Sequence, residues 1–128
     1  MVGLEERDDS GVVQMTSEFP GWVIEFRGCT EKVPDCHFGQ FEVAQQGAPA
    51  QQVEVLTTVQ IEQILAGEMG KAALTDDERA IILATAGLHL IEQCIQRDGH
   101  VPPVLHLTGQ LFRSQGAGRR LLQECGLL

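Results

Sequence analysis

The stretch TDDERAIILATAGLHLIEQCIQR, residues 75–97, is the longest part of the chain with one uninterrupted hydrophobic period. At about 100° per residue, its apolar side chains fall on one half of a helix and its polar side chains on the other. The apolar half holds Ile81, Leu83, Ala84, Leu88, Leu90, Ile91, Cys94 and Ile95, and the polar half holds Thr85, His89, Glu92, Gln93, Gln96 and Arg97. We therefore expect a helix roughly 33 Å long, against which the rest of the chain packs.

Both ends of this helix carry recognisable signals. Thr75 can cap the first free N–H groups, and Glu78 completes a capping box three residues later. Asp76 and Asp77 stand where the helix dipole favours negative charge. Gly99 predicts the stop, because glycine adopts the left-handed conformation at the end of a helix without a steric clash.

The first half of the chain is rich in short β-forming runs separated by turn signals. These runs are residues 12–16, 22–27, 38–45 and 51–56. In the second run, Trp22, Ile24 and Phe26 alternate with Val23 and Glu25, as in a strand with one face on a core. Connections of five to ten residues predict an antiparallel meander.

Two segments of this half carry few strand signals. Residues 28–37 hold a glycine, a proline and three charged residues, so we interpret them as a loop. Residues 1–11 are acidic and have no period, which predicts a disordered terminus before a single domain at residues 12–128.

After the strands, the hydrophobic period changes to that of helices. Residues 57–69 form the first candidate helix, with Thr57 and Gln60 as a capping box and Gly70 as the stop. Residues 103–114 form a candidate third helix, and residues 119–125 form a last one that buries Leu121 and Leu122.

The predicted fold class is α+β. An N-terminal antiparallel β-meander of three or four strands packs against a C-terminal set of three or four helices around one long central helix. The alternative is a β-hairpin appended to a four-helix bundle.

Length and composition place the chain among ordinary globular domains. It has 128 residues, 43% of them apolar, and a net charge of −9. Residues 1–56 carry −7, residues 57–100 carry −4 and residues 101–128 carry +2. Because nucleic-acid binding depends on neutralising phosphates, this acidity argues against a nucleic-acid partner. No apolar run is long enough for a membrane span, and the acidic N-terminus lacks the basic start of a signal peptide, so we expect a cytoplasmic protein with no membrane partner.

The closest approach to a metal motif is formed by Cys29, Cys36 and His37. Thiolate and imidazole are zinc ligands, but structural zinc sites usually pair ligands two to four residues apart and need four of them. These two cysteines are seven residues apart, so a strand-to-strand loop with reduced thiols is the alternative. A reversible disulfide between them is a further alternative, and Lys32 would favour a thiolate. Cys94 and Cys125 are also expected to be reduced, and no cofactor is predicted.

Residues 113–120, RSQGAGRR, form the one basic and glycine-punctuated patch. A glycine-rich turn that enters a helix can present N–H groups to an anion such as a nucleotide phosphate, to which Arg113, Arg119 and Arg120 would add donors. The segment matches no phosphate-binding motif, so a helix–helix turn with solvated arginines is the alternative.

Histidines supply no catalytic motif. His89 falls on the polar half of the long helix, and His100 and His106 flank its proline-containing exit. No serine, cysteine or carboxylate stands at a recognisable motif distance from them, so we predict no catalytic residue.

The sequence is therefore most consistent with a non-catalytic protein-interaction module, such as an accessory factor, an inhibitor or a homo-oligomeric scaffold. Ile82, Leu127 and Leu128 are apolar residues that the predicted packing leaves uncovered, and they are the predicted interface with another protein or a second copy. The alternatives are a thiol- or zinc-dependent regulator or small enzyme using Cys29, Cys36 and His37, and anion or nucleotide binding at the basic C-terminal segment.

Overall fold

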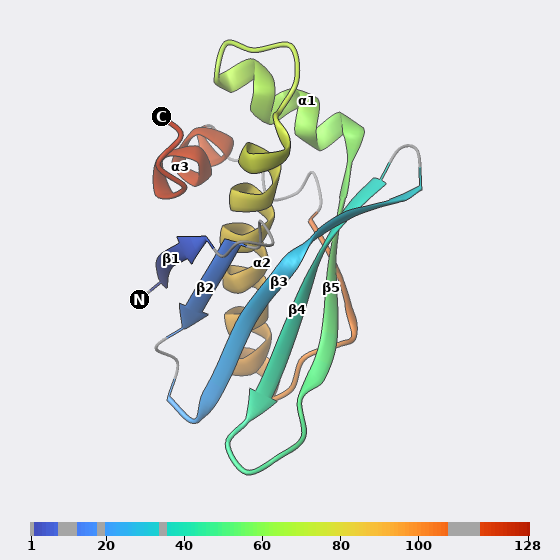
Figure 1. Ribbon diagram of the computed structural model, residues 1–128, viewed down its shortest axis with the longest axis vertical. Helices are drawn as coiled ribbons and strands as arrows, with labels where there is room; N and C mark the ends of the chain where they lie inside the picture. The colour runs from blue at the N-terminus through green and yellow to red at the C-terminus, as the bar shows by residue number, and fades with distance from the viewer. Residues whose placement is uncertain (1, 8–12, 18–19, 34–35, 108–115) are drawn as a thin grey trace.

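The computed structural model describes residues 2–7, 13–17, 20–33, 36–107 and 116–128. The elements follow one another as β1 (Val2–Arg7), β2 (Val13–Ser17), β3 (Trp22–Val33), β4 (Cys36–Gln45), β5 (Gln51–Thr58), α1 (Val59–Glu68), α2 (Asp76–Asp98), β6 (Val104–His106) and α3 (Ala117–Glu124). This order confirms the predicted α+β class, with α2 as the long central helix (Figure 1).

The main sheet has the strand order β3-β4-β5-β6. Its first three strands form the predicted antiparallel meander, and the short β6 adds to β5 in parallel orientation. Strands β1 and β2 pair antiparallel as a separate two-stranded sheet beside β3.

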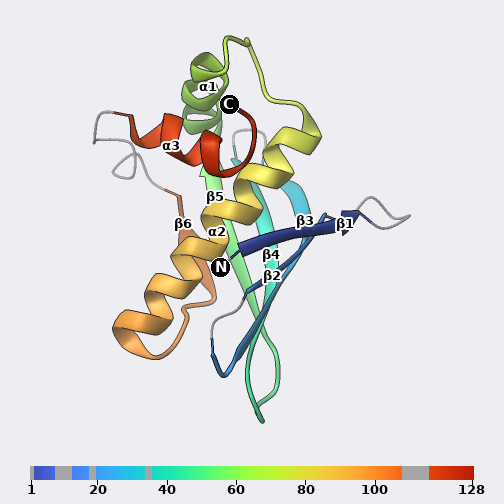
Figure 2. The same ribbon diagram turned by 90° about the vertical axis from the view of Figure 1, so that its left-hand side faces the viewer.

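One face of the main sheet is covered by helices. The row Phe26, Phe41 and Val53, formed by directly paired positions, is buried under α2, as are Ile24 and Val43. The helices lie on the same side of the sheet (Figure 2), and in Figure 1 no helix lies in front of β3, β4 and β5. The predicted alternation in residues 22–26 is confirmed, since Ile24 and Phe26 are buried and Val23 is exposed.

Both predicted helix starts occur at threonines. Helix α2 has the complete capping box of Thr75 and Glu78, and Gly99 ends it in the left-handed conformation with φ 73°, as predicted. Helix α1 begins one residue later than expected, because Thr58 rather than Thr57 accepts the hydrogen bond from the Ile61 N–H.

The prediction for Ile82 is wrong. It is only 2% exposed and belongs to the core, so it cannot be a surface interface residue. The two-sided pattern failed because α2 is covered on more than one side between residues 82 and 88, where even Thr85 is buried. The sheet contacts one side of α2, and α3 packs against another.

Gly87 allows the close approach of α2 to the sheet. A Cβ atom at this position would lie 2.6 Å from Cε1 and Cζ of Phe41 and 3.1 Å from Cγ2 of Val55. The absence of a side chain therefore sets the distance between the helix and the sheet.

Three segments differ from the predictions. Residues 2–7 form β1 rather than a disordered terminus, and residues 28–37 lie largely within β3 and β4 rather than in a loop. The charges and glycine of the second segment are tolerated because β3 contains irregularities in its register with β4 between Phe26 and Gly28 and again between Glu31 and Val33. Val104–His106 form β6 rather than a helix, and residues 108–114 of the predicted helix lie outside the described residues.

The last predicted helix is confirmed as α3. Leu122 is fully buried, and Leu121 packs against the core, as expected. No helix among the described residues is long and apolar enough to cross a membrane.

Candidate functional site

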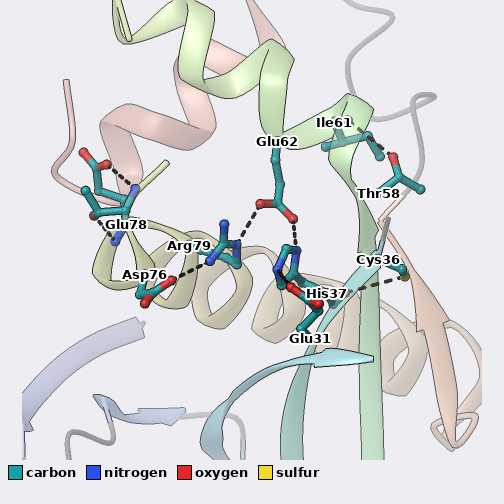
Figure 3. Close-up of polar contacts among 10 residues, drawn as sticks. Glu31, Cys36, His37, Thr58, Ile61, Glu62, Asp76, Glu78 and Arg79 are labelled. Carbon is teal, nitrogen blue, oxygen red and sulfur yellow. Dashed lines mark hydrogen bonds and ion pairs between the residues drawn. The ribbon is translucent and has the colours of Figure 1, made fainter. Parts of the chain in front are cut away.

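Ionisable side chains from three parts of the fold meet at one end of the sheet, on its covered side (Figure 3). We call the set of Glu31, His37, Glu62, Asp76 and Arg79 the polar cluster. Glu31 and His37 are paired positions of β3 and β4, Glu62 lies in the first turn of α1, and Asp76 and Arg79 lie in the first turn of α2.

The centre of the polar cluster is Glu62, which uses both carboxylate oxygens. Nδ1 of His37 lies 2.7 Å from Oε2 of Glu62, and Nε of Arg79 donates to Oε1 at 2.7 Å. The side chains of His37, Glu62 and Arg79 are only 13%, 10% and 16% exposed. A buried charge of this kind is tolerated because it is paired and hydrogen-bonded.

The periphery of the cluster is open to solvent. Arg79 also donates from Nη1 to Oδ1 of the exposed Asp76 at 2.9 Å, and Nε2 of His37 lies 3.5 Å from Oε2 of the largely exposed Glu31. Since a carboxylate only accepts, Nδ1 of His37 carries the proton toward Glu62. The imidazole is therefore held in one orientation by a carboxylate.

Arg79 is held firmly in its charged form. Burial alone would lower the pKa of its guanidinium, but the hydrogen bond and negative charge of Glu62, together with the hydrogen bond to Asp76, raise the pKa overall. The cluster thus keeps a permanent positive charge between its carboxylates.

Cys29 lies beside the polar cluster but is not activated by it. Burial raises the pKa of the Cys29 thiol, and the charges of Glu62 and Asp76 raise it further, against the opposing charge of Arg79. A neutral thiol is a poor nucleophile and a poor zinc ligand. Cys29, His37, Asp76 and Arg79 line the same polar cleft of about 310 Å³.

The predicted zinc ligands are not brought together. His37 and Cys29 occupy positions of the covered face, whereas Cys36 is the neighbour of His37 on one strand and so belongs to the opposite face. Within residues 2–7, 13–17, 20–33, 36–107 and 116–128, no group of three or more His, Cys, Asp and Glu side chains is arranged to hold a metal ion. Cys29, Cys36, Cys94 and Cys125 are free thiols in this structure.

The other predicted site residues are dispersed. Arg119 and Arg120 are exposed on α3, and Arg113 lies outside the described residues. His89 pairs with Glu124 of α3 at 3.1 Å between Nε2 and Oε2. Of the predicted interface residues that remain, Leu127 packs against the core and Leu128 is exposed.

Glu62 and Arg79 were not among the predicted site residues, although the sequence carries a signal for Glu62. Glu62 stands in register with the buried Ile61, Leu65 and Ala66 of α1. A charged residue within an apolar stripe predicts a buried partner of opposite charge, but it does not identify that partner.

The open face of the main sheet is the second feature of interest, because most positions in two of its rows are polar. Glu25, Glu42 and Gln52 form one row of directly paired positions, and Gln40, Glu54 and Val104 form the next. Glu25 and Glu42 are therefore direct neighbours of like charge, and Arg27 contacts Glu25 at 3.4 Å. Val23 and Val104 are exposed apolar residues on the same face.

The third feature is an apolar cleft of about 560 Å³ between α1 and the ends of β5 and β6. Thr57, Ile61 and Leu107 contribute buried parts of its lining, and Thr58, Ile64 and His106 are exposed at its mouth. In Figure 3, Cys36 and Thr58, which also line this cleft, lie on the other side of His37 and Glu62 from Arg79.

Comparison of the chain with protein-family models, with curated proteins and with solved structures found no match.

Proposed function

We propose that this protein is a non-catalytic interaction module that binds the basic surface of another protein through the open face of its main sheet. The observation that carries the proposal is the direct pairing of Glu25 with Glu42 on that face. Like charges at directly opposite positions destabilise a sheet. A cationic partner would turn this unfavourable pair into a binding determinant.

Apolar contacts support the same surface. Val23 lies at one end of the open face, and Val104 lies beside Glu54 on the edge strand β6. Interfaces commonly combine apolar contacts with charges that set orientation and association rate. The partner surface that fits is therefore apolar and flanked by lysine or arginine.

The negative charge of this face disfavours two other binding partners, a second copy of the chain and nucleic acid. A second copy would bring Glu25 and Glu42 against the same residues, and like-charge contacts across an interface are unfavourable. Nucleic acid would meet the same repulsion, in a chain whose net charge is −9.

The experiment combines charge reversal with zero-length crosslinking. The protein is immobilised and exposed to an extract of its source cells, and bound proteins are crosslinked with a carbodiimide that joins carboxylates to lysines. We expect one partner whose lysines crosslink to Glu25 or Glu42. Glu42→Lys should weaken its binding at least tenfold, because it places a positive charge against a basic surface.

Glu68→Lys is the matched control, since it makes the same charge change at the exposed end of α1. It should leave partner binding within about twofold, as expected for a charge outside the interface. The proposal is wrong if no partner is retained, if Glu42→Lys and Glu68→Lys bind equally, or if the crosslinks map outside the open face.

A further inference from the structure

Thr57, one of the residues that line the apolar cleft, carries a polar group that the fold does not use. Oγ1 of Thr57 is buried and has no hydrogen-bond partner, and the whole residue is only 3% exposed. Its neighbour across the strands is His37, whose imidazole is directed to Glu62 instead. A buried hydroxyl without a partner costs about 1–3 kcal/mol, so its presence at this position requires an explanation.

The rest of the lining is suited to an apolar molecule. The cleft surface is mostly apolar, with Leu56, Ile61, Ile64 and Leu107 among its lining residues, and the volume of about 560 Å³ lies within the range of small-molecule sites. Ile64 is 46% exposed at the mouth, which leaves an apolar side chain in water when the cleft is empty.

The lining also restricts the charge of a ligand. Apart from His106, which is exposed at the mouth, the lining residues that the structure describes include no ionisable side chain other than the Cys36 thiol. A charged group placed next to Thr57 would therefore lose its hydration without gaining a counter-ion. A neutral group that forms one hydrogen bond with the Thr57 hydroxyl would avoid this cost.

We infer that the cleft is a binding site for a small neutral molecule with an apolar body and one hydroxyl, such as an alkylphenol, whose hydroxyl bonds to Oγ1 of Thr57. No lining residue of the cleft belongs to the two rows that hold Glu25 and Glu54, and the inference does not depend on the proposed protein partner.

The test uses 4-ethylphenol and ethylbenzene, which differ by the hydroxyl alone. Each is titrated into the full chain, and binding is measured from backbone amide shifts by NMR. We expect 4-ethylphenol to shift amides of residues 56–64 and 106–107. Thr57→Val should weaken 4-ethylphenol binding about five- to tenfold, the factor that corresponds to one net hydrogen bond, and should leave ethylbenzene binding within about twofold.

Three further variants separate the hydroxyl from its surroundings. Thr57→Ser should keep the preference for 4-ethylphenol, because it keeps the hydroxyl. Ile64→Ser should weaken both ligands, since it removes apolar surface at the mouth. Thr30→Val makes the same chemical change at an exposed strand position outside this cleft and should alter neither.

The inference is overturned if 4-ethylphenol does not bind, if the shifted amides lie elsewhere, or if Thr57→Val changes both ligands equally. Thr57→Val should itself fold well, because valine has nearly the same shape and removes the unpaired hydroxyl. If Thr57→Val does not unfold cooperatively, the other two variants decide. Thr57→Ser must then keep the preference for 4-ethylphenol, and Ile64→Ser must weaken the binding of both ligands.

Discussion

The two faces of the main sheet differ in how their charged side chains are paired. On the covered face, Glu62 bonds to both Arg79 and His37, so the carboxylate meets a cation and an N–H donor. On the open face, Glu25 stands directly opposite Glu42, and the cation Arg27 contacts Glu25. The covered face pairs its charges, whereas the like-charge pair of the open face should cost stability, as is expected if that face is the proposed binding surface.

The difference also explains why the polar cluster is not the proposed site. It joins five ionisable side chains, but its central members already satisfy one another. Three elements are joined by it, because His37, Glu62 and Arg79 come from β4, α1 and α2. Its arrangement therefore accounts for the positions of both helices.

The largest expected effect is the loss of Arg79. Arg79→Met should lower the free energy of unfolding by about 2–4 kcal/mol, because it leaves the carboxylate of Glu62 buried with only His37 as a partner. Urea denaturation at neutral pH measures the change. Arg97→Met is the control, because Arg97 is exposed and its ion pair within the described part of the chain is with the adjacent Asp98.

The control should change stability by no more than about 0.5 kcal/mol. In the double variant Arg79→Met/Glu62→Met, the loss should be well below the sum of the two single losses, since both single changes remove the same interaction. If Arg79→Met is as mild as Arg97→Met, the polar cluster is not what holds the helices, and the contrast between the faces fails.

A smaller effect is expected where the covered face allows close packing. Gly87→Ala places a methyl group 2.6 Å from the ring of Phe41, which costs about 1–3 kcal/mol as overpacking and regains about 1 kcal/mol of helix propensity. The net loss should be about 1 kcal/mol, measured by urea denaturation.

Gly67 offers the matched comparison, because it is also helical and a Cβ there would meet nothing within 4 Å. Gly67→Ala should therefore stabilise the protein by about 0.5–1 kcal/mol. Equal effects of the two substitutions would show that α2 does not need a glycine to approach the sheet.

The sequence predicted those features that depend on neighbours along the chain. The capping box of Thr75 and Glu78, the alternation of Ile24 and Phe26, and the stop at Gly99 all follow from local geometry. The burial of Ile82 depends on what covers a second side of α2, and no pattern within the helix reports that.

The polar cluster and the apolar cleft could not be predicted for the same reason. His37 and Glu62 are 25 residues apart, and Glu62 and Arg79 are 17 apart. Their contacts arise only after α1 and α2 fold back over the sheet. Thr57 carried no signal for a site, since it stands in a strand-to-helix junction where threonine is common.

The smallest expected effect tests the open face directly. Glu42→Gln removes the repulsion with Glu25 and should raise the free energy of unfolding by about 0.2–1 kcal/mol. The gain should shrink as sodium chloride is raised toward 1 M, because salt screens exposed charges, whereas a gain from better packing would persist. If Glu42→Gln instead lowers stability, the carboxylate is stabilising in the free protein. The like-charge pair would then be no sign of a partner, and the proposed interaction surface would lose the observation on which it rests.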